Sequence, residues 1–468
     1  MEIKAFINGK FINKTKTFDI ISPTGTKFAT APSLDKEDIA FAFDSARKSQ
    51  HEWELLTPEK RVWYLEKFAQ ILDSKKDEIA PMIVDEIAKP LKGAVKEITR
   101  TVELIRNVNQ EYLKMYKSEM NFENLNKKVD IYRKALGVIL AISPYNYPVN
   151  LSMSKIAPAL VTGNTVVFKS ATHGTGVAYQ LAKIFDEIKL PKGVFNFVTG
   201  RGKNLGDSLY TNRHINGISF TGGEKVGMEI SSASKMAIVI LELGGKDIAI
   251  VRQDANIDQT ATKIIQGAFG FNGQRCTAIK RLLVHKNIKK PLVDKIVELT
   301  NQLKVGPAID NNDITPVISS HSADKIMHLV DDAIKKGAKP LTKIKQEDNL
   351  IHPIILDNVT TDMDIAWIEQ FGPVLPIIEF ESDQEAIDIT NESRYGLQAS
   401  IFTEDKKQAQ HIAFHLDVGS VNINGPSQRG PDALPFTGTK HSGLNIQGVK
   451  YSLETMTRTF NIVDNYNK

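Results

Sequence analysis

The first half of the chain shows two successive hydrophobic patterns. Residues 35–120 are rich in charge and carry apolar residues at helical spacing, which predicts a set of long helices. From residue 137 short apolar runs alternate with helical stretches. We predict strands at 137–143, 164–169, 194–198, 217–220 and 237–241, with a helix that ends near residue 188. Strands that alternate with helices indicate a parallel sheet with crossover helices.

The two ends of the chain have patterns of their own. Near the start, Asn8-Gly9 separates two short apolar runs and predicts a hairpin. Residues 120–134 are polar and then alternate, which suits a small hairpin or arm. The strand–helix rhythm resumes near residue 281 and continues to about residue 420. A glycine-rich stretch at 425–448 then precedes a final helix and strand.

Composition excludes several classes of protein. Of the 468 residues 41% are hydrophobic and 24% charged, and the net charge is only +4, so we expect no nucleic-acid partner. The single cysteine excludes an internal disulfide, and without HExxH or paired histidines we expect no metal site. No apolar run approaches the roughly 18 residues of a membrane span. The first residues lack a secretion signal, so we expect a cytoplasmic protein.

Glycines suggest a nucleotide site. They crowd the ends of three predicted strands, at Gly200, Gly202, Gly206, Gly222, Gly223, Gly244 and Gly245. Ligands bind beyond the carboxyl ends of parallel strands, where helix N-termini attract phosphate. The spacing fits neither GxGxxG nor GxxxxGK[ST], so glycines that merely serve tight turns explain the pattern equally well.

Three side chains are candidates for catalysis. Cys276 follows a predicted helix at 258–270 in a polar turn, and the neighbouring Arg275 would favour a thiolate; an inert buried cysteine is the alternative. Glu242 directly follows an apolar strand, where partial burial would suit it to general-base work, unless it is an ordinary solvated glutamate. Asn146 lies on a strand-to-helix turn and could donate to an oxyanion, or serve only the turn.

The motifs taken together resemble the aldehyde dehydrogenase superfamily. The segments that carry the resemblance, in order, are Ser143-Pro144-Tyr145-Asn146-Tyr147-Pro148, Phe220-Thr221-Gly222, Leu241-Glu242-Leu243-Gly244-Gly245-Lys246, Gly273-Gln274-Arg275-Cys276 and Glu369-Gln370-Phe371-Gly372-Pro373. The resemblance covers essentially the whole chain. Within the superfamily the chain looks most like the non-phosphorylating, NADP-dependent glyceraldehyde-3-phosphate dehydrogenases, on the segments 145–151, 428–432 and 447–454.

The resemblance implies an α/β protein with the aldehyde dehydrogenase fold. A Rossmann-like cofactor-binding domain would take residues 1–245, interrupted by an arm at about 118–134, and an α/β catalytic domain would take residues 246–425. Residues 426–468 would return to the cofactor domain and to the arm, which serves oligomerisation. We therefore expect a homotetramer.

The resemblance also implies a mechanism. The thiolate of Cys276 attacks an aldehyde carbon, and the amide of Asn146 and the backbone N–H of Cys276 hold the oxyanion. Hydride leaves to the nicotinamide and a thioester forms. Glu242 then activates the water that releases the acid.

The implied cofactor is NADP, with NAD as the alternative. Its binding residues would be Ser143, Lys169, Thr172, Asp207, Gly222, Gly223, Glu369 and Phe371. Relatives that prefer NAD often have a glutamate where Thr172 stands, whereas Thr172 near Lys169 can accept a 2′-phosphate. Two departures stand out. Gly223 and Glu224 stand where many relatives have serine and threonine, so a hydroxyl is missing and a negative charge is added near the expected diphosphate. Either cofactor binding is weakened or backbone N–H groups alone hold the diphosphate. Gln370 replaces an apolar residue or proline with little expected effect.

The implied substrate is a small phosphorylated aldehyde, glyceraldehyde 3-phosphate, oxidised irreversibly to 3-phosphoglycerate. Its binding residues would be Arg100, Tyr147, Arg275, Thr277 and Arg429. Three converging guanidiniums suit a phosphate dianion; the alternative for Arg100 is an ordinary helix-surface arginine. The rivals are a lactaldehyde or succinate semialdehyde dehydrogenase of the same chemistry, a CoA-acylating enzyme and a catalytically silent relative.

Overall fold

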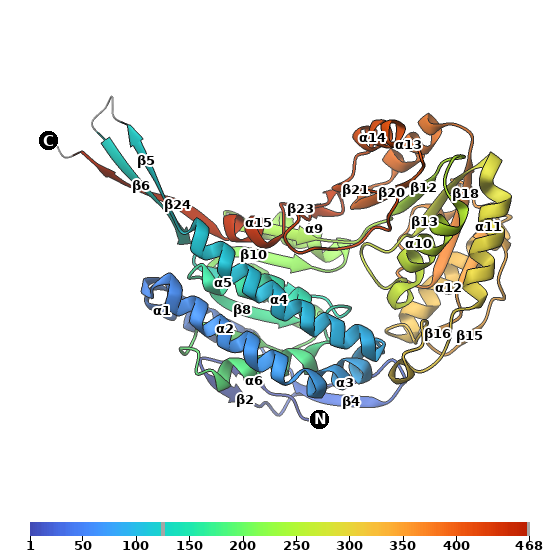
Figure 1. The fold of residues 1–468 in the computed structure, drawn as a ribbon. Helices are drawn as coiled ribbons and strands as arrows, with labels where there is room; N and C mark the ends of the chain where they lie inside the picture. The colour runs from blue at the N-terminus through green and yellow to red at the C-terminus, as the bar shows by residue number, and fades with distance from the viewer. Residues whose placement is uncertain (123–126, 466–468) are drawn as a thin grey trace.

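In the computed structural model, which describes residues 1–122 and 127–465, two sheets of mainly parallel strands form the body (Figure 1). The first sheet has the order β2-β1-β9-β8-β7-β10-β11-β23, and its five strands from β9 to β11 are parallel. Its bounds are β1 Ala5–Ile7, β2 Lys10–Ile12, β7 Val138–Ser143, β8 Thr165–Ser170, β9 Phe195–Val198, β10 Ile215–Thr221, β11 Ile238–Glu242 and β23 Gly443–Leu444.

Alternation along the strands places helices on both faces of this sheet. Val138 and Leu140 of β7 belong to the core beneath α1, whereas Ile139 and Ala141 belong to the core beneath α5. Helices α2 and α4 form an outer layer over α5. The helices are α1 Lys36–Leu55, α2 Pro58–Ser74, α3 Lys76–Ile87, α4 Leu91–Met115, α5 Asn150–Val161, α6 Thr175–Glu187, α7 Gly202–Leu205, α8 Asp207–Tyr210 and α9 Glu224–Ala233.

The predicted elements of this half are confirmed. All five predicted strands exist, and four long helices fill residues 36–115. The hairpin turn has Asn8 and Gly9 at positive φ, the geometry that such turns require. A second hairpin pairs β3 Thr17–Ile21 with β4 Lys27–Pro32.

The second sheet has the order β14-β17-β18-β13-β12-β20-β21. Its bounds are β12 Ile248–Val251, β13 Arg281–His285, β14 Lys339–Pro340, β17 Ile354–Asp357, β18 Val374–Phe380, β20 Gln398–Phe402 and β21 Ser420–Ile423. The sequence placed the new rhythm near residue 281, whereas β12 already begins it at Ile248. Helices cover both faces: α10 Ile257–Phe269, α11 Lys286–Asn301, α12 Ser320–Lys335, α13 Asp383–Glu392 and α14 Lys406–His415. A small pair, β15 Gln346–Glu347 and β16 Leu350–Ile351, lies beside this sheet.

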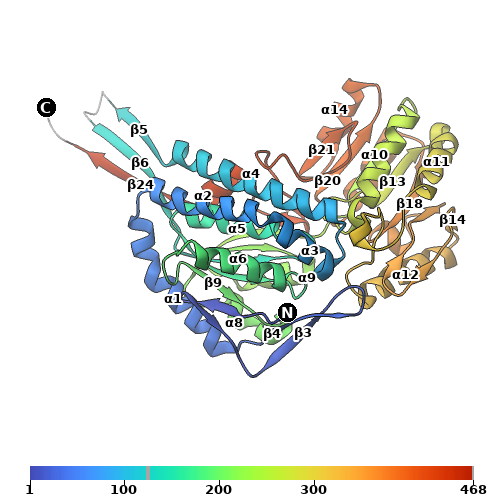
Figure 2. The ribbon, with the colours of Figure 1, turned by 60° about the horizontal axis from the view of Figure 1, so that its bottom comes forward.

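A three-stranded arm projects from the body (Figures 1 and 2). It consists of β5 Lys117–Phe122, β6 Lys127–Ala135 and β24 Thr457–Asp464, paired antiparallel in the order β24-β6-β5. The predicted hairpin therefore pairs with the C-terminal strand, which follows α15 Val449–Thr455. Residues 123–126 of the predicted arm and residues 466–468 of the C-terminal segment lie outside the described residues. In the described part of the chain no helix is long and apolar enough to cross a bilayer.

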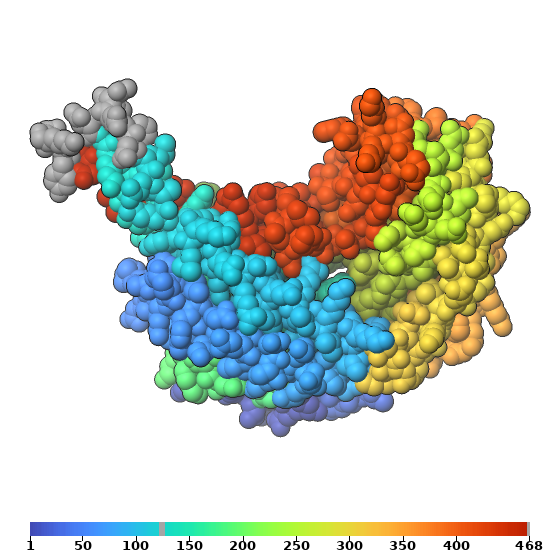
Figure 3. Space-filling model, in the orientation of Figure 1, coloured from blue at the N-terminus to red at the C-terminus, as the bar shows by residue number. Residues whose placement is uncertain are grey.

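A short C-terminal segment, residues 439–444, joins the two sheets, and we call it the strap. Its first part, β22 Thr439–Lys440, pairs with β19 Tyr395–Gly396 beside the second sheet. Its last part, β23, pairs with β11 of the first sheet and sets Gly443 opposite Glu242. In Figure 3 the red C-terminal residues lie in the hollow between the arm and the second sheet.

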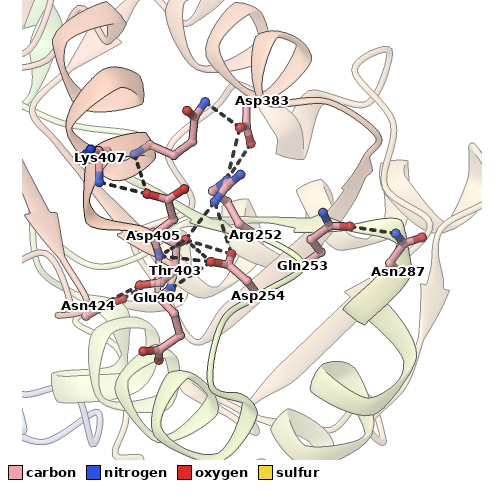
Figure 4. Close-up of polar contacts among 11 residues, drawn as sticks. Arg252, Gln253, Asp254, Asn287, Asp383, Thr403, Glu404, Asp405, Lys407 and Asn424 are labelled. Atoms are coloured by element: carbon pink, nitrogen blue, oxygen red, sulfur yellow. Dashed lines mark hydrogen bonds and ion pairs between the residues drawn. The ribbon is translucent and has the colours of Figure 1, made fainter.

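The carboxyl edge of the second sheet is closed by a polar network (Figure 4). The carboxylate of Asp254 accepts hydrogen bonds from the hydroxyl of Thr403 at 2.7 Å and from the backbone N–H groups of Glu404 and Asp405 at 3.1 Å each. Arg252 pairs with Asp254 at 3.3 Å and with the first residue of α13 at 3.0 Å. The network joins the ends of β12 and β20 to the start of α13.

Asp254→Ala should therefore destabilise the protein. The substitution removes the acceptor of the Glu404 N–H, one of two acceptors of the Asp405 N–H and one of the two carboxylate partners of Arg252, which should cost about 2 kcal/mol. The measurement is the urea midpoint of unfolding by circular dichroism. Asp294→Ala, which removes an exposed i,i+4 partner of Lys290 on α11, is the control and should shift the midpoint little. Equal shifts for both variants would contradict the prediction.

Candidate active site

A cavity of about 300 Å³ opens between α4, the turn after α10 and the C-terminal segment. The thiol-bearing residue Cys276 lines it. So do all five residues that the sequence predicted to bind substrate: Arg100, Tyr147, Arg275, Thr277 and Arg429. Arg100 and Arg429 are 329 positions apart in the sequence, and the fold brings them together. Arg100 is thus a cavity residue as well as a helix residue.

Each of the three guanidiniums already has partners. Arg100 makes a two-pronged ion pair with Asp432, at 2.9 and 2.6 Å. Arg429 donates to the side-chain carbonyl of Gln447 at 2.6 Å. Arg275 donates to backbone carbonyls of Gln266, Gly267 and Gly270. Because a guanidinium has five N–H donors, a further acceptor can still be bound by each.

Cys276 follows a tight turn that α10 leads into. The turn is a 3₁₀ segment, Gly270–Gly273, in which Phe271 and Asn272 adopt positive φ. Burial raises the pKa of the Cys276 thiol to about 11, although Lys280 and Arg429 act to lower it. Arg275 is not among the main charges that act on the thiol, and its guanidinium donates to backbone carbonyls.

Glu242 ends β11 and is fully buried. Burial raises the pKa of its carboxyl to about 7, with Arg429 and Lys155 acting in the opposite direction. Its Oε1 atom is buried and has no hydrogen-bond partner among the described residues. The predicted burial is thus confirmed and is more complete than expected. A carboxylate with an unused acceptor, near a thiol, is suited to take a proton.

Asn146 is tied to the segment that leads into Cys276. Its Nδ2 donates to the carbonyl of Gln274 at 2.9 Å, and its backbone carbonyl accepts from Lys89 at 2.8 Å. Lys89 is itself paired with Glu97 at 2.5 Å in the interior. An amide fixed in this way presents its second N–H in a set direction.

Two buried lysines were missed by sequence reasoning. The ammonium of Lys155 donates to Thr221 at 2.7 Å, and burial lowers its pKa to about 7. Lys280 lies beside Cys276 and Glu369, with its side chain 1% exposed. The signal for Lys155 was a single charge in the apolar stretch 151–161, which forms a wholly buried helix. Lys280 gave no comparable signal, because it stands just before β13 and next to a second cationic residue, Arg281.

The predicted cofactor residues lie mainly where strands of the first sheet end. Ser143 ends β7, Lys169 lies in β8, Thr172 follows β8, and Gly222 and Gly223 follow β10. Asp207 is exposed at the start of α8. Its carboxylate accepts from Tyr210 at 3.0 Å, and within the described chain it makes no hydrogen bond to the other predicted cofactor residues.

Glu224 does not stand as a free charge. Its carboxylate accepts from the hydroxyl of Tyr395 at 2.7 Å and contacts the His441 ring at 2.7 Å and Arg394 at 3.2 Å. These partners hold the pKa of Glu224 below its usual value despite burial. The expected repulsion of a diphosphate is therefore offset, and the contacts tie α9 to β19 and to the strap.

The segment 368–371 packs against the residues that follow β11 and β7. Glu369 accepts from the backbone N–H of Gly245 at 3.1 Å, and Phe371 adopts positive φ with its ring against Tyr145. Gln370 was expected to matter little. It is instead buried, donates to the carbonyls of Lys280 and Val374 at 3.0 and 2.8 Å, and accepts from Lys246 at 2.5 Å.

Comparison with known proteins decides the family. The aldehyde dehydrogenase family model matches residues 11–462. The protein belongs to the aldehyde dehydrogenase family. It is 45% identical to an NADP-dependent glyceraldehyde-3-phosphate dehydrogenase of Streptococcus equinus, with 97% of each chain covered, and 42% identical to that of Pisum sativum, with 99% and 95% covered. The crystal structure of the Bacillus halodurans C-125 enzyme complexed with NADP matches with a TM-score of 0.98, at 44% identity over 99% of each chain.

The predicted aldehyde dehydrogenase fold is therefore confirmed, and the residues of this family member fit NADP. Gly223 precedes α9, and a Cβ there would meet nothing within 4 Å, so the helix start is open to a ligand. Lys169 is buried, its pKa is lowered to about 8, and its ammonium donates to the Ser170 carbonyl. No carboxylate stands at Thr172. The backbone N–H groups at the start of α9 and the ammonium of Lys169 are donors that can bind phosphate groups.

The free enzyme should hold Cys276 as a thiol. Because burial raises its pKa to about 11, alkylation by iodoacetamide should accelerate steadily from about pH 7 to about pH 10 without a plateau. The measurement is the mass of the labelled chain, which is unambiguous because the protein has one cysteine. Cys276→Ser should take up no label. A plateau reached below about pH 8 would show a thiolate that burial does not suppress.

Proposed function

We propose that this aldehyde dehydrogenase oxidises glyceraldehyde 3-phosphate to 3-phosphoglycerate with NADP and without inorganic phosphate. One observation carries the substrate: Arg100, Arg275 and Arg429 line the same cavity as Cys276. Several guanidiniums around one small cavity suit a phosphate dianion. The hydroxyls of Tyr147 and Thr277 line it too. The names of the relatives with 42–45% identity support the same assignment.

Cys276 is the proposed nucleophile. The thiolate form of Cys276, which has already lost its proton, attacks: the sulfur bonds to the aldehyde carbon and the carbonyl electron pair moves to oxygen. The resulting oxyanion accepts hydrogen bonds from Nδ2 of Asn146 and from the backbone N–H of Cys276. NADP, when bound, supplies the hydride acceptor that turns this adduct into a thioester. We assign it to the residues at the strand ends, Ser143, Lys169, Thr172, Gly222 and Gly223, together with Asp207, Glu369 and Phe371.

Glu242 is the proposed base for the second half of the reaction. It takes a proton from a water molecule, whose oxygen attacks the thioester carbonyl. Collapse of that adduct breaks the carbon–sulfur bond, expels the Cys276 thiolate and releases the acid. Its pKa of about 7 leaves enough carboxylate for this task at and above neutral pH.

The domain assignment is part of the proposal. Residues 1–245 bind the cofactor, residues 246–425 carry the nucleophile, and residues 426–468 return to the first sheet and the arm. The arm, with exposed Ile462 and Val463 on β24, supports assembly into a homotetramer. We place the enzyme in the cytoplasm.

The first experiment follows absorbance at 340 nm with glyceraldehyde 3-phosphate in buffer free of inorganic phosphate. We expect rapid reduction of NADP, slower reduction of NAD, and 3-phosphoglycerate as the product. Cys276→Ser is the control for turnover. Turnover of lactaldehyde or succinate semialdehyde but not of the triose phosphate would contradict the substrate. No turnover of any aldehyde would favour a catalytically silent relative.

Arg429→Leu should separate phosphate binding from chemistry. Loss of one charged contact should raise KM for glyceraldehyde 3-phosphate about tenfold to a hundredfold, but KM for glyceraldehyde little. Arg429 also acts electrostatically on Cys276 and Glu242, so kcat should fall by a similar factor for both substrates. Arg213→Leu, on an exposed turn, is the matched control. Equal KM effects on the two aldehydes would remove Arg429 from the phosphate site.

A further inference from the structure

Lys280 connects the loop that carries Cys276 to the segment that precedes β18. It stands four residues after Cys276, immediately before β13, and its side chain turns back toward the loop. The ammonium donates to the backbone carbonyl of Cys276 at 2.5 Å and pairs with Oε1 of Glu369 at 3.2 Å. The Lys280 side chain is 1% exposed. One buried cation thus bridges the nucleophile loop and Glu369.

The position of Lys280 is fixed from its own backbone as well. Its N–H donates to the carbonyl of Asp247 at 2.8 Å, and its carbonyl accepts from Gln370 at 3.0 Å. Gln370 directly follows Glu369 and is itself held by Lys246. Side chain and backbone of Lys280 are therefore both bound by the same short segment. A lysine constrained in this way cannot swing away from Cys276 without breaking several buried contacts.

Burial raises the pKa of the Cys276 thiol, and among the nearby charges Lys280 lowers it most. Five titratable groups interact electrostatically with Cys276: Lys280, Arg429, Lys155, Glu242 and Asp247. Glu242 and Asp247 disfavour the thiolate. Of the two cations that lower the thiol pKa, Lys280 has the larger effect. Arg429 is partly committed to Gln447 and to the proposed substrate phosphate.

We propose that Lys280 is a positioning residue that joins the Cys276 loop to Glu369 and supplies the buried positive charge beside the thiolate. The proposal rests on the proposed function in taking Cys276 as the nucleophile. The alternative is a purely structural lysine that neutralises Glu369. The two differ in one observable, because a structural lysine would leave the ionisation of Cys276 unchanged once the fold is intact.

The experiment measures alkylation of the single cysteine by iodoacetamide against pH, in the protein without substrate or cofactor. Lys280→Gln removes the charge but keeps a hydrogen-bond donor. We expect its rate-against-pH curve to move to higher pH, with the rate near pH 8 reduced about tenfold, because only the thiolate reacts. Lys280→Arg keeps the charge and should react like the unmodified protein.

Lys246→Gln is the matched control. Lys246 is equally buried and contacts Gln370, and it is not among the main charges that act on Cys276. Its curve should stay in place. An unchanged curve for Lys280→Gln, or equal shifts for Lys280→Gln and Lys246→Gln, would overturn the proposal. If Lys280→Gln loses the native circular dichroism spectrum, Lys280→Met, which also removes the charge and keeps the length of the side chain, takes its place: a shift to higher pH supports the proposal and an unshifted curve overturns it.

The alkylation result does not depend on the substrate. A protein that fails to oxidise glyceraldehyde 3-phosphate but shows the Lys280 shift would contradict the proposed function and keep the role of Lys280. Turnover of glyceraldehyde 3-phosphate with NADP, together with an unshifted alkylation curve for Lys280→Gln, would keep the proposed function and contradict the role of Lys280.

Discussion

The candidate active site depends on the pairing of β23 with β11 opposite Glu242. This pairing places the strap on the edge of the first sheet, while β22 holds the same strap to β19 beside the second sheet. The backbone N–H of Leu243 donates to the carbonyl of Ser442 at 2.9 Å, one residue beyond the proposed base. A Cβ on Gly443 would lie 2.7 Å from the carbonyl oxygen of Leu241, so the close approach needs glycine. Two sheets with separate cores are thereby fixed around one cavity.

Burial between the two sheets then sets the protonation of the site. It raises the pKa of Cys276 to about 11 and of Glu242 to about 7, and it lowers that of Lys155 to about 7. Every shift favours the neutral form, as expected where water is excluded. Because Glu242 and Lys155 approach the same value from opposite sides, either can hold a proton near neutral pH.

The sequence predicted the local structure well because local structure follows hydrophobic periodicity. The five parallel strands of the first sheet, the long helices and the hairpin at Asn8-Gly9 were all evident. Strand β12 was missed, since its four residues follow directly on a glycine-rich segment that carries polar side chains. The motifs also brought forward Cys276, Glu242 and Asn146, which the fold gathers around one loop.

Side-chain direction was beyond the reach of sequence. Arg275 is next to Cys276 in the chain, yet its guanidinium binds backbone carbonyls, while Lys280 reaches the nucleophile loop from four residues away. Nothing in the sequence indicated a structural role for Gln370, which hydrogen-bonds three residues in the interior. Each of these contacts either joins segments far apart in the chain or depends on the direction in which a turn folds back. The spacing of residues in the sequence indicates neither of these.

Glu224 shows how such distant contacts can reverse the meaning of a residue. A carboxylate at the first position of α9 is favoured by the helix dipole, but it would compete with a phosphate for the same amides. Here Tyr395, Arg394 and His441 hold it from β19 and the strap. Its charge is thereby directed into a contact between the two sheets, and the open start of α9 at Gly223 stays available for a ligand. The sequence suggested that Glu224 would oppose cofactor binding. In the structure it instead helps to hold the strap and β19 to the first sheet, the arrangement on which the site depends.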